Sequence, residues 1–214
     1  MLFPSKNKNI VTGVSFKTDG EKIKLAQNIA RFLKFNDFAY LNQVHSGKVV
    51  EVDGAVKGKD GDALYTFNRG ILLCVFTADC VPVYVYGKGF AGIIHAGWRG
   101  FVKGIFENFF ERIKGKAEVK ELKAVIGACI CGNCYEVGDD VAKYFDSRFF
   151  KKTGEKYFLD LKACAFDRLV SMGIKDKNIL LSPYCTKHHS YFHSYRRNKT
   201  NLRNVNFIGM RGES

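Results

Sequence analysis

The sequence predicts an α+β fold with mixed sheets, and three observations support this. Between residues 71 and 94 three apolar runs follow one another, and a continuous apolar run bounded by turn residues is typical of a strand buried on both faces. Segments 21–35 and 101–114 carry apolar residues at spacings of three and four, which predicts amphipathic helices. Strands and helices interleave without strict alternation and without repeats, so we predict mixed rather than purely parallel sheets.

The three apolar runs end in polar, reactive residues. The runs themselves are Ile71–Thr77, Val81–Tyr86 and Phe90–Ile94. Cys80 follows the first run and His95 follows the third. Side chains at the ends of core strands are held by a rigid scaffold, which suits a functional site.

The other elements follow from the same patterns. The further expected strands are 8–17, 38–44, 48–52, 62–66, 122–127, 157–160, 178–182 and 205–209. Ser46-Gly47 is a turn signal, so 48–52 is the expected hairpin partner of 38–44, and 54–61 is expected to be a polar loop. Two more helices are expected at 137–145 and 161–172, the second ended by Gly173 at its C-cap position.

The length and composition favour one folded domain over residues 1–214. The chain has 214 residues, of which 46% are hydrophobic and 26% are charged, as in an ordinary soluble globular protein. Three prolines and the lack of low-complexity tracts give no interior linker at which to divide it.

The chain is strongly basic, with a formal net charge of +13. Such a charge favours anionic partners, but the lysines are scattered and no nucleic-acid-binding signature is visible, so we expect no nucleic acid partner. No apolar run approaches the roughly 18 residues of a membrane span, and the first residues lack a signal-peptide core, so we expect no membrane partner. An odd count of 7 cysteines indicates reduced thiols and a cytoplasmic location.

Two histidines and one cysteine form the strongest candidate site. His45, Cys80 and His95 each follow an apolar strand and precede a turn. Two imidazoles and a thiolate are good zinc ligands, and three protein ligands leave a fourth position open, as in catalytic zinc sites. The same residue types also suit a cysteine nucleophile with a histidine base, oriented by Asp79, so residue types alone leave both chemistries open.

A second group of cysteines is a rival metal site. Cys129, Cys131 and Cys134 lie within six residues, but a complete site would need Cys164 or Cys185 brought in by the fold. Structural metal, a redox pair and simple small thiols in a tight loop all remain open for this group.

Several motifs resemble the YfiH, or laccase-domain, family, and the resemblance spans almost the whole chain. Histidine–Ala–Gly–Trp–Arg–Gly placed after Ala–Asp–Cys–Val–Pro is highly specific. The matching motifs, in family order, are Gly13-Val14-Ser15, Asn42-Gln43-Val44-His45, Gly61-Asp62-Ala63, Ala78-Asp79-Cys80-Val81-Pro82, His95-Ala96-Gly97-Trp98-Arg99-Gly100, Cys134-Tyr135-Glu136-Val137 and Ser194-Tyr195-Arg196-Arg197.

This resemblance implies a four-layer α/β/β/α sandwich and one zinc ion held by His45, Cys80 and His95. The family is known as polyphenol oxidase or laccase-like, as purine nucleoside phosphorylase and as peptidoglycan-editing factor. The implied activities are phosphorolysis of adenosine, inosine, guanosine and methylthioadenosine, and deamination of adenosine. Purine nucleosides and phosphate are therefore the expected partners of a monomer or weak homodimer.

Roles for individual residues follow from these reactions. For deamination, Asp62 or Asp79 is the expected proton carrier, with orientation of His45 or His95 as the alternative role of Asp79. The expected substrate-binding residues are Asn42, Trp98, Arg99, Arg196 and Arg197, with the arginines suited to phosphate and the tryptophan, or Tyr195, to the base. The family usually has Gly-Pro where this chain has Gly127-Ala128, and Thr-Gly-Arg where it has Asn201-Leu202-Arg203. We expect these departures to affect which nucleoside is preferred more than they affect metal binding.

Three other classes of function remain open. The first is a cysteine hydrolase or amidase that edits peptidoglycan precursors through Cys80. The second is a copper-dependent polyphenol oxidase, which is disfavoured because one compact ligand trio is visible and multicopper chemistry needs several. The third is a zinc-binding partner protein without catalytic activity.

Overall fold

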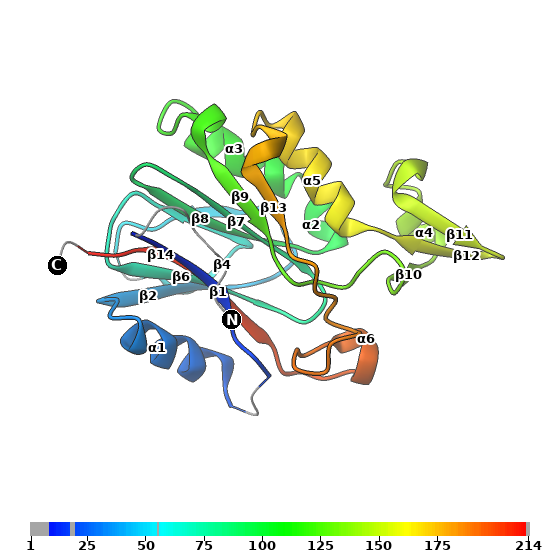
Figure 1. The fold of residues 1–214 in the computed structure, drawn as a ribbon, viewed down its shortest axis with the longest axis horizontal. Coiled ribbons are helices and arrows are strands. Elements are labelled where there is room, and N and C mark those ends of the chain that lie inside the picture. Colours follow the sequence, from blue (N-terminus) through cyan, green and yellow to red (C-terminus); the bar gives the residue numbers. More distant parts are fainter. Residues whose placement is uncertain (1–8, 18–19, 55, 213–214) are drawn as a thin grey trace.

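A computed structural model of the chain describes residues 9–17, 20–54 and 56–212. Two β-sheets pack face to face and helices cover the outer face of each, which confirms the α+β prediction and the four-layer sandwich (Figure 1). In the five-stranded sheet the order is β1 (Ile10–Val14), β14 (Asn204–Met210), β6 (Ile71–Thr77), β2 (Asp37–Asn42) and β4 (Lys57–Asp60). In the six-stranded sheet it is β13 (Ile179–Leu181), β9 (Lys123–Ile126), β7 (Val81–Gly87), β8 (Phe90–Ala96), β5 (Ala63–Thr66) and β3 (Val49–Glu51).

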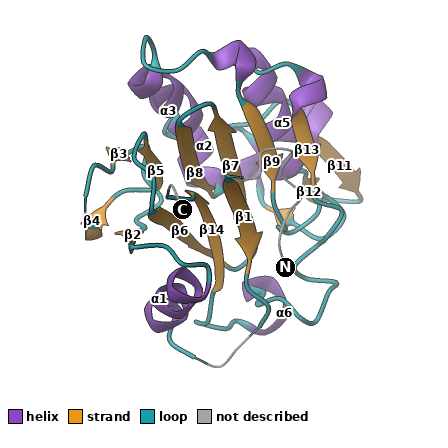
Figure 2. Cartoon of the chain, turned by 60° about the vertical axis from the view of Figure 1, so that its left-hand side comes forward, coloured by secondary structure: helices purple, strands orange, loops and turns teal. Residues whose placement is uncertain are grey.

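Both sheets are mixed, as expected. In the first sheet β2 runs parallel to β6 and β4, while β14 is antiparallel to its two neighbours. In the second sheet, the central strands β9, β7, β8 and β5 are antiparallel to one another. The edge strands β13 and β3 are parallel to their neighbours. Figure 2 shows the strands of the two layers stacked between the helices.

The helices divide between the two outer faces. Helix α1 (Lys22–Phe32) covers the five-stranded sheet, and α2 (Trp98–Val102), α3 (Ile105–Ile113) and α5 (Leu161–Ser171) cover the six-stranded sheet (Figure 1). A small projecting sheet orders β10 (Glu136–Val137), β12 (Lys156–Leu159) and β11 (Phe150–Thr153). The other helical segments are α4 (Asp139–Ala142), α6 (Tyr195–Asn198), η1 (Val119–Glu121), η2 (Ser147–Phe149) and η3 (Asp176–Asn178).

Strand β6 shows why the central strands are apolar throughout. Every residue of this strand is buried. Leu72, Cys74 and Phe76 face α1, whereas Leu73 and Val75 face the other sheet. Because side chains alternate between the faces of a strand, a strand covered on both sides needs apolar residues at every position.

Four details differ from the sequence-based expectations. The expected helix 137–145 is only the short α4, because Val137 lies in β10 and the helix ends at Ala142. Segment 101–114 is interrupted at Gly104, whose φ of 68° is left-handed, so α2 and α3 are separate helices. Segment 48–52 contributes β3, but β3 pairs in parallel with β5 of the opposite sheet and forms no hairpin with β2. The expected polar loop 54–61 contains the exposed edge strand β4. Residue 8 of the expected first strand lies outside the described residues.

Across the described part of the chain, none of the helices combines the length and apolar character needed to cross a membrane.

Candidate metal site

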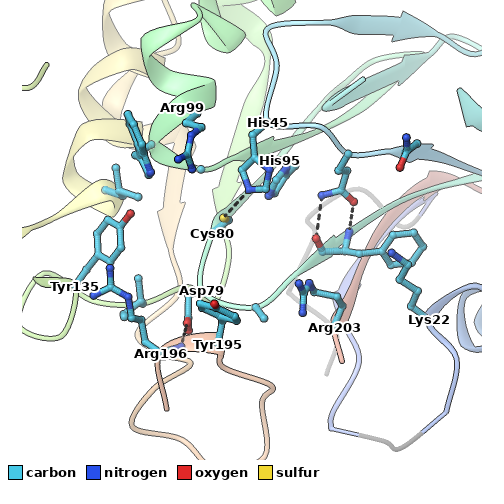
Figure 3. Close-up of a pocket in the computed structure, with 18 residues that line it drawn as sticks. Lys22, His45, Asp79, Cys80, His95, Arg99, Tyr135, Tyr195, Arg196 and Arg203 are labelled. Atoms are coloured by element: carbon cyan, nitrogen blue, oxygen red, sulfur yellow. Dashed lines mark hydrogen bonds between the residues drawn. The ribbon is translucent and has the colours of Figure 1, made fainter. Parts of the chain in front are cut away.

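A cavity of about 480 Å³ lies where β2, β6 and β8 end and α2 and α6 begin (Figure 3). It brings together motifs from the whole length of the chain. The residues that line it are Lys22, Asn42, Gln43, His45, Phe76, Ala78, Asp79, Cys80, His95, Gly97, Trp98, Arg99, Ile130, Tyr135, Leu161, Tyr195, Arg196 and Arg203.

His45, Cys80 and His95 meet in this cavity. One potential ligand atom from each lies within 4.8 Å of the other two, and the Cys80 sulfur is 3.9 Å from His45 Nε2. The pairing of β7 with β8 sets Pro82 opposite His95, which brings Cys80 beside the end of β8. His45 has a left-handed φ of 53°, a conformation that non-glycine residues adopt mainly where the surroundings enforce it.

Gly97 permits this close approach. A Cβ atom at this position would lie 2.9 Å from His45 Cδ2, closer than real Cβ contacts, and 3.0 Å from the Cys80 sulfur, tighter than nearly all of them. Any residue can adopt the φ of −83° of Gly97. Glycine is therefore required here because a side chain would not fit, and not because of the backbone conformation.

Asp62 holds both histidines from behind. Its carboxylate is fully buried and bonds His95 Nδ1 at 2.9 Å, while it accepts hydrogen bonds from the His45 amide, the Ser46 amide and the Ser46 hydroxyl. Burial raises the pKa of Asp62, but the hydrogen bonds from His95 and Ser46 outweigh this and lower it to about 2. Asp62 is therefore an ionised carboxylate that orients the His95 ring and fixes the backbone at His45.

The three side chains favour a thiolate beside a charged imidazole. Burial raises the pKa of Cys80, but His95 and His45 lower it to about 6. Burial lowers the pKa of His95, whereas the Cys80 thiolate and Asp62 raise it to about 9. A thiolate is the form of cysteine that binds metals and attacks electrophiles.

This donor set fits a zinc ion. The bond from His95 Nδ1 to Asp62 leaves Nε2 as the ring nitrogen that can face a metal, an arrangement in which a carboxylate fixes the tautomer of a ligand. Two imidazoles and one thiolate facing an open cavity match three protein ligands with a fourth position for water or substrate.

Asp79 organises the opposite wall of the cavity. This residue is buried and has a left-handed φ of 93°. Its carboxylate accepts hydrogen bonds from the Thr186 hydroxyl at 2.6 Å and from the Arg196 amide at 2.7 Å. The carboxylate that contacts His45 and His95 is thus that of Asp62, while Asp79 connects Cys80 to the loops of the C-terminal third.

Four cationic side chains line the cavity: Lys22, Arg99, Arg196 and Arg203. Burial and the charge of Arg203 lower the pKa of Lys22. The Arg99 guanidinium stacks on Trp98 at 4.4 Å and that of Arg196 stacks on Tyr135 at 4.9 Å. Such a concentration of positive charge favours an anionic ligand.

Asn42 and Arg197 lie differently from the other expected substrate residues. Asn42 lines the cavity and donates to Asp60 at 2.8 Å. The Arg197 guanidinium instead donates to the backbone carbonyls of Thr186, Lys187, His189 and Phe192, so its contacts shape the loop beneath the cavity.

Among the polar side chains of the cavity, four have no predicted role: Lys22, Gln43, Tyr135 and Arg203. Gln43 and Tyr135 stand inside motifs already matched, next to residues that were assigned roles. The Gln43 amide group forms a double bridge to the Phe76 backbone, with bonds of 2.9 and 2.7 Å. Lys22 lies at the start of an ordinary amphipathic helix, and its sequence context carries no signal of a site.

Proteins of similar sequence include enzymes of purine metabolism by name. A protein named purine nucleoside phosphorylase from Aquifex aeolicus is 36% identical over 186 residues, covering 85% of this chain and 88% of the relative. A protein named adenosine deaminase RL5 from an unknown prokaryotic organism is 33% identical over 185 residues, covering 76% of this chain and 70% of the relative.

Solved structures share the fold over nearly the full length. The structure of YlmD from Geobacillus stearothermophilus has a TM-score of 0.85 and 26% identity, and covers 96% of this chain and 93% of the other. The structure of the hypothetical protein YfiH from Bacillus licheniformis has a TM-score of 0.84 and 27% identity, and covers 94% and 93%. A family model described as multi-copper polyphenol oxidoreductase laccase matches residues 9–211, and this chain belongs to that family.

Proposed function

We propose that this protein is a zinc-dependent purine nucleoside phosphorylase, which converts adenosine, inosine, guanosine or methylthioadenosine and phosphate into the free base and a ribose 1-phosphate. One observation carries the proposal: the His45–Cys80–His95 trio and four cationic side chains line the same cavity. The names of the relatives agree with it.

The cationic wall would bind phosphate. Arg99 and Arg196 are held on aromatic rings, which limits their rotation and presents their N–H groups to an anion. Guanidinium groups bind phosphate in a bidentate manner, so these two arginines would orient the attacking oxygen toward C1′ of the ribose. Lys22 and Arg203 would add charge from the opposite side of the cavity (Figure 3).

Aromatic side chains would bind the purine. Tyr195 lines the cavity and is 45% exposed, so its ring offers a face to a flat base. Burial raises the pKa of Tyr135 to about 12, so its hydroxyl stays protonated at neutral pH and can donate a hydrogen bond to the base or to phosphate.

His45, Cys80 and His95 would hold the zinc ion, with Asp62 fixing the ring orientation of His95. When bound, zinc supplies Lewis acidity and lowers the pKa of a coordinated water to about 7. The buried Asp62 would keep its negative charge throughout, balancing the cation.

Deamination of adenosine is the second candidate, because a trio of this kind suits hydrolytic chemistry and one relative is named adenosine deaminase. The reaction replaces the C6 amino group with oxygen from water and releases ammonia, so an acid–base group must take a proton from the water and pass it to the departing amine. Asp79 lines the cavity, whereas Asp62 is fully buried behind His95, so we propose Asp79 for the proton and Asp62 for orientation.

We propose that the protein acts in the reducing cytoplasm. All seven cysteines are free thiols in the structure, which agrees with that compartment. We also propose that the protein acts on small molecules alone, without nucleic acid or membrane.

The test combines metal analysis with a nucleoside panel, in the presence and absence of phosphate. We expect phosphate-dependent release of base and ribose 1-phosphate from a zinc-containing protein, and inosine from adenosine without phosphate if deamination also occurs. Cys80→Ala should lose turnover and the zinc ion of this cavity, while the matched control Cys74→Ala, which alters a core thiol facing α1, should keep both.

Other outcomes would reject the proposal in distinct ways. Phenol oxidation that requires copper would indicate an oxidase. Inactivation of metal-free protein by iodoacetamide, with turnover of an amide substrate, would indicate a cysteine hydrolase. Full zinc content with no turnover of any nucleoside would indicate a partner protein without catalytic activity.

A further inference from the structure

A second group of metal-ligand side chains lies on the loops that follow β9 and β13. Cys131, Cys134, Cys185 and His188 each offer one ligand atom, and these four atoms all lie within 4.8 Å of one another. In the sequence they form two pairs of equal spacing, Cys131-Gly-Asn-Cys134 and Cys185-Thr-Lys-His188. Paired ligands two residues apart, joined across a long separation, are typical of structural zinc sites.

The topology explains how the two pairs meet. Strands β9 and β13 are parallel neighbours, so the chain leaves both of them at the same edge of the sheet. The pairing continues past the strand ends as a parallel bridge between Cys129 and Cys185, and the Thr186 amide donates to the Cys129 carbonyl at 3.0 Å. Cys185 is therefore the third thiol beside Cys131 and Cys134, and His188 is the fourth ligand, while Cys129, which the sequence places in the group, instead helps to align the loops.

The local backbone directs the side chains to one point. The Cys134 and Tyr135 amides donate to the Cys131 carbonyl at 2.9 and 3.1 Å, forming a tight turn between the two thiols. The Cys131 amide donates to the Cys185 sulfur at 3.3 Å, and Cys134 Sγ lies 3.0 Å from His188 Nε2. Amide donors to sulfur are the outer-shell contacts that stabilise metal-bound thiolates.

We propose that Cys131, Cys134, Cys185 and His188 bind a structural zinc ion, separate from the ion proposed for the nucleoside cavity. Three thiolates and one imidazole exclude magnesium and calcium, which prefer oxygen, and four protein ligands give a closed tetrahedral site without catalytic water. Cys134 and Cys185 are buried while His188 is exposed, so the ion would be sealed on the protein side and capped by histidine.

A disulfide explains the arrangement less well. A bond between any two of the three cysteines would leave the third thiol and His188 without a reason to converge, whereas a metal uses all four. All the cysteines are also free thiols in the structure.

The site would hold one wall of the cavity in place. Ile130 and Tyr135, which flank the Cys131–Cys134 pair, line the cavity. The Ile130 amide donates to the Asp79 carbonyl at 3.0 Å. The zinc would thus act as a clamp between two loops that carry cavity residues, and this inference does not depend on the reaction proposed above.

Metal stoichiometry tests the proposal without any activity assay. Protein purified under reducing conditions should contain about two zinc ions per chain, one for each cluster. Cys134→Ser should lose one zinc and keep the other, and Cys80→Ala should lose the other. The matched control Cys164→Ala removes a buried thiol of α5 outside both clusters and should keep both ions.

Two further experiments test the site even if Cys134→Ser fails to fold: cobalt substitution, and replacement of the exposed ligand His188. Cobalt in a three-thiolate site gives a more intense sulfur-to-cobalt absorption than in a one-thiolate site, so Cys80→Ala should retain most of that intensity. His188→Ala changes an exposed side chain and should fold, yet should bind zinc more weakly and release it faster to a chelator.

The outcomes also separate this inference from the proposed function. A single zinc that survives in Cys80→Ala and is lost in Cys134→Ser would support the second site and reject zinc in the nucleoside cavity. A single zinc lost in Cys80→Ala and kept in Cys134→Ser would overturn the second site. Iron or copper on these ligands, or a disulfide among them in protein isolated without oxidation, would also overturn it.

Discussion

Replacing Asp62 with asparagine should loosen both histidines of the cavity trio. Asp62 is fully buried, and its two oxygens share four hydrogen bonds, with His95 Nδ1, the His45 amide, the Ser46 amide and the Ser46 hydroxyl. Asparagine has nearly the same shape, so the change removes charge and one acceptor oxygen without leaving a cavity. Whichever way the new amide points, its NH₂ group faces donors instead of accepting from them.

The magnitude follows from the bonds that are lost. Each hydrogen bond to a charged group contributes about 1.5–3 kcal/mol, and one oxygen accounts for two of the four bonds. After partial relaxation we expect the free energy of unfolding to fall by about 3 kcal/mol. For a chain of this size that corresponds to a drop in Tm of about 10 °C. Loss of the orienting carboxylate should also weaken zinc binding by about 10–100-fold.

Thermal unfolding of zinc-loaded and chelator-treated protein separates the two effects. The hydrogen bonds belong to the chain, so Asp62→Asn should lower the Tm even in metal-free protein, and the difference from the parent should widen when zinc is present. The control Asp53→Asn changes an exposed carboxylate near β3 and should leave Tm and zinc affinity unchanged. A Tm within about 1 °C of the parent, with equal zinc affinity, would refute the role assigned to Asp62.

Further variants test the cavity from other sides. Gly97→Ala would place a methyl group 2.9 Å from the His45 ring and 3.0 Å from the Cys80 sulfur, so its zinc content should fall, whereas Gly54→Ala, which meets nothing within 4 Å, should be neutral by the same measurement. Arg99→Ala should raise the KM for phosphate by about 10-fold or more, because a charged hydrogen bond of about 1.5–3 kcal/mol is lost. The KM for the nucleoside should change less, and equal changes in both KM values would contradict a phosphate role for Arg99. Exhaustive chelation should lower the Tm of the parent protein and zinc should restore it, since ions that bind only the folded state stabilise it; an unchanged Tm would contradict bound zinc.

The core strands leave strong local signals in the sequence, whereas the grouping of His45, Cys80 and His95 is predicted from their strand-end positions and from the family resemblance. The fully apolar run of β6 reports burial on both faces, and the strand-end positions of Cys80 and His95 report a rigid location. Pairing between distant segments is not visible in the same way. Strand β3 follows a turn signal after β2, yet it joins the opposite sheet. Its apolar pattern fits pairing with β5 as well as pairing with β2, so the pattern alone does not identify the partner strand.

The sequence groups Cys131 with Cys134 and offers Cys185 as one of two possible partners, but it does not show that His188 joins them. Each pair is a short motif of ordinary frequency, and only the parallel pairing of β9 with β13 shows that the two loops share an edge of the sheet. Lys22 is the first residue of α1 and lines the cavity. The apolar pattern of this helix predicts which face is buried, but it gives no sign that the first residue lines a cavity.

Asp79 gives a physical reason for the two clusters to depend on each other. Its left-handed φ of 93° is costly for a residue with a side chain, so neighbouring contacts must hold it. Those contacts come from the Ile130 amide, the Thr186 hydroxyl and the Arg196 amide, and the first two lie beside the Cys131–Cys134 and Cys185–His188 pairs. Because Cys80 directly follows Asp79, order in those loops fixes where the Cys80 sulfur lies. Loss of the proposed structural zinc in Cys134→Ser should therefore leave the cavity trio with its own ion but make that ion easier for a chelator to remove, although none of the four ligands touches the trio.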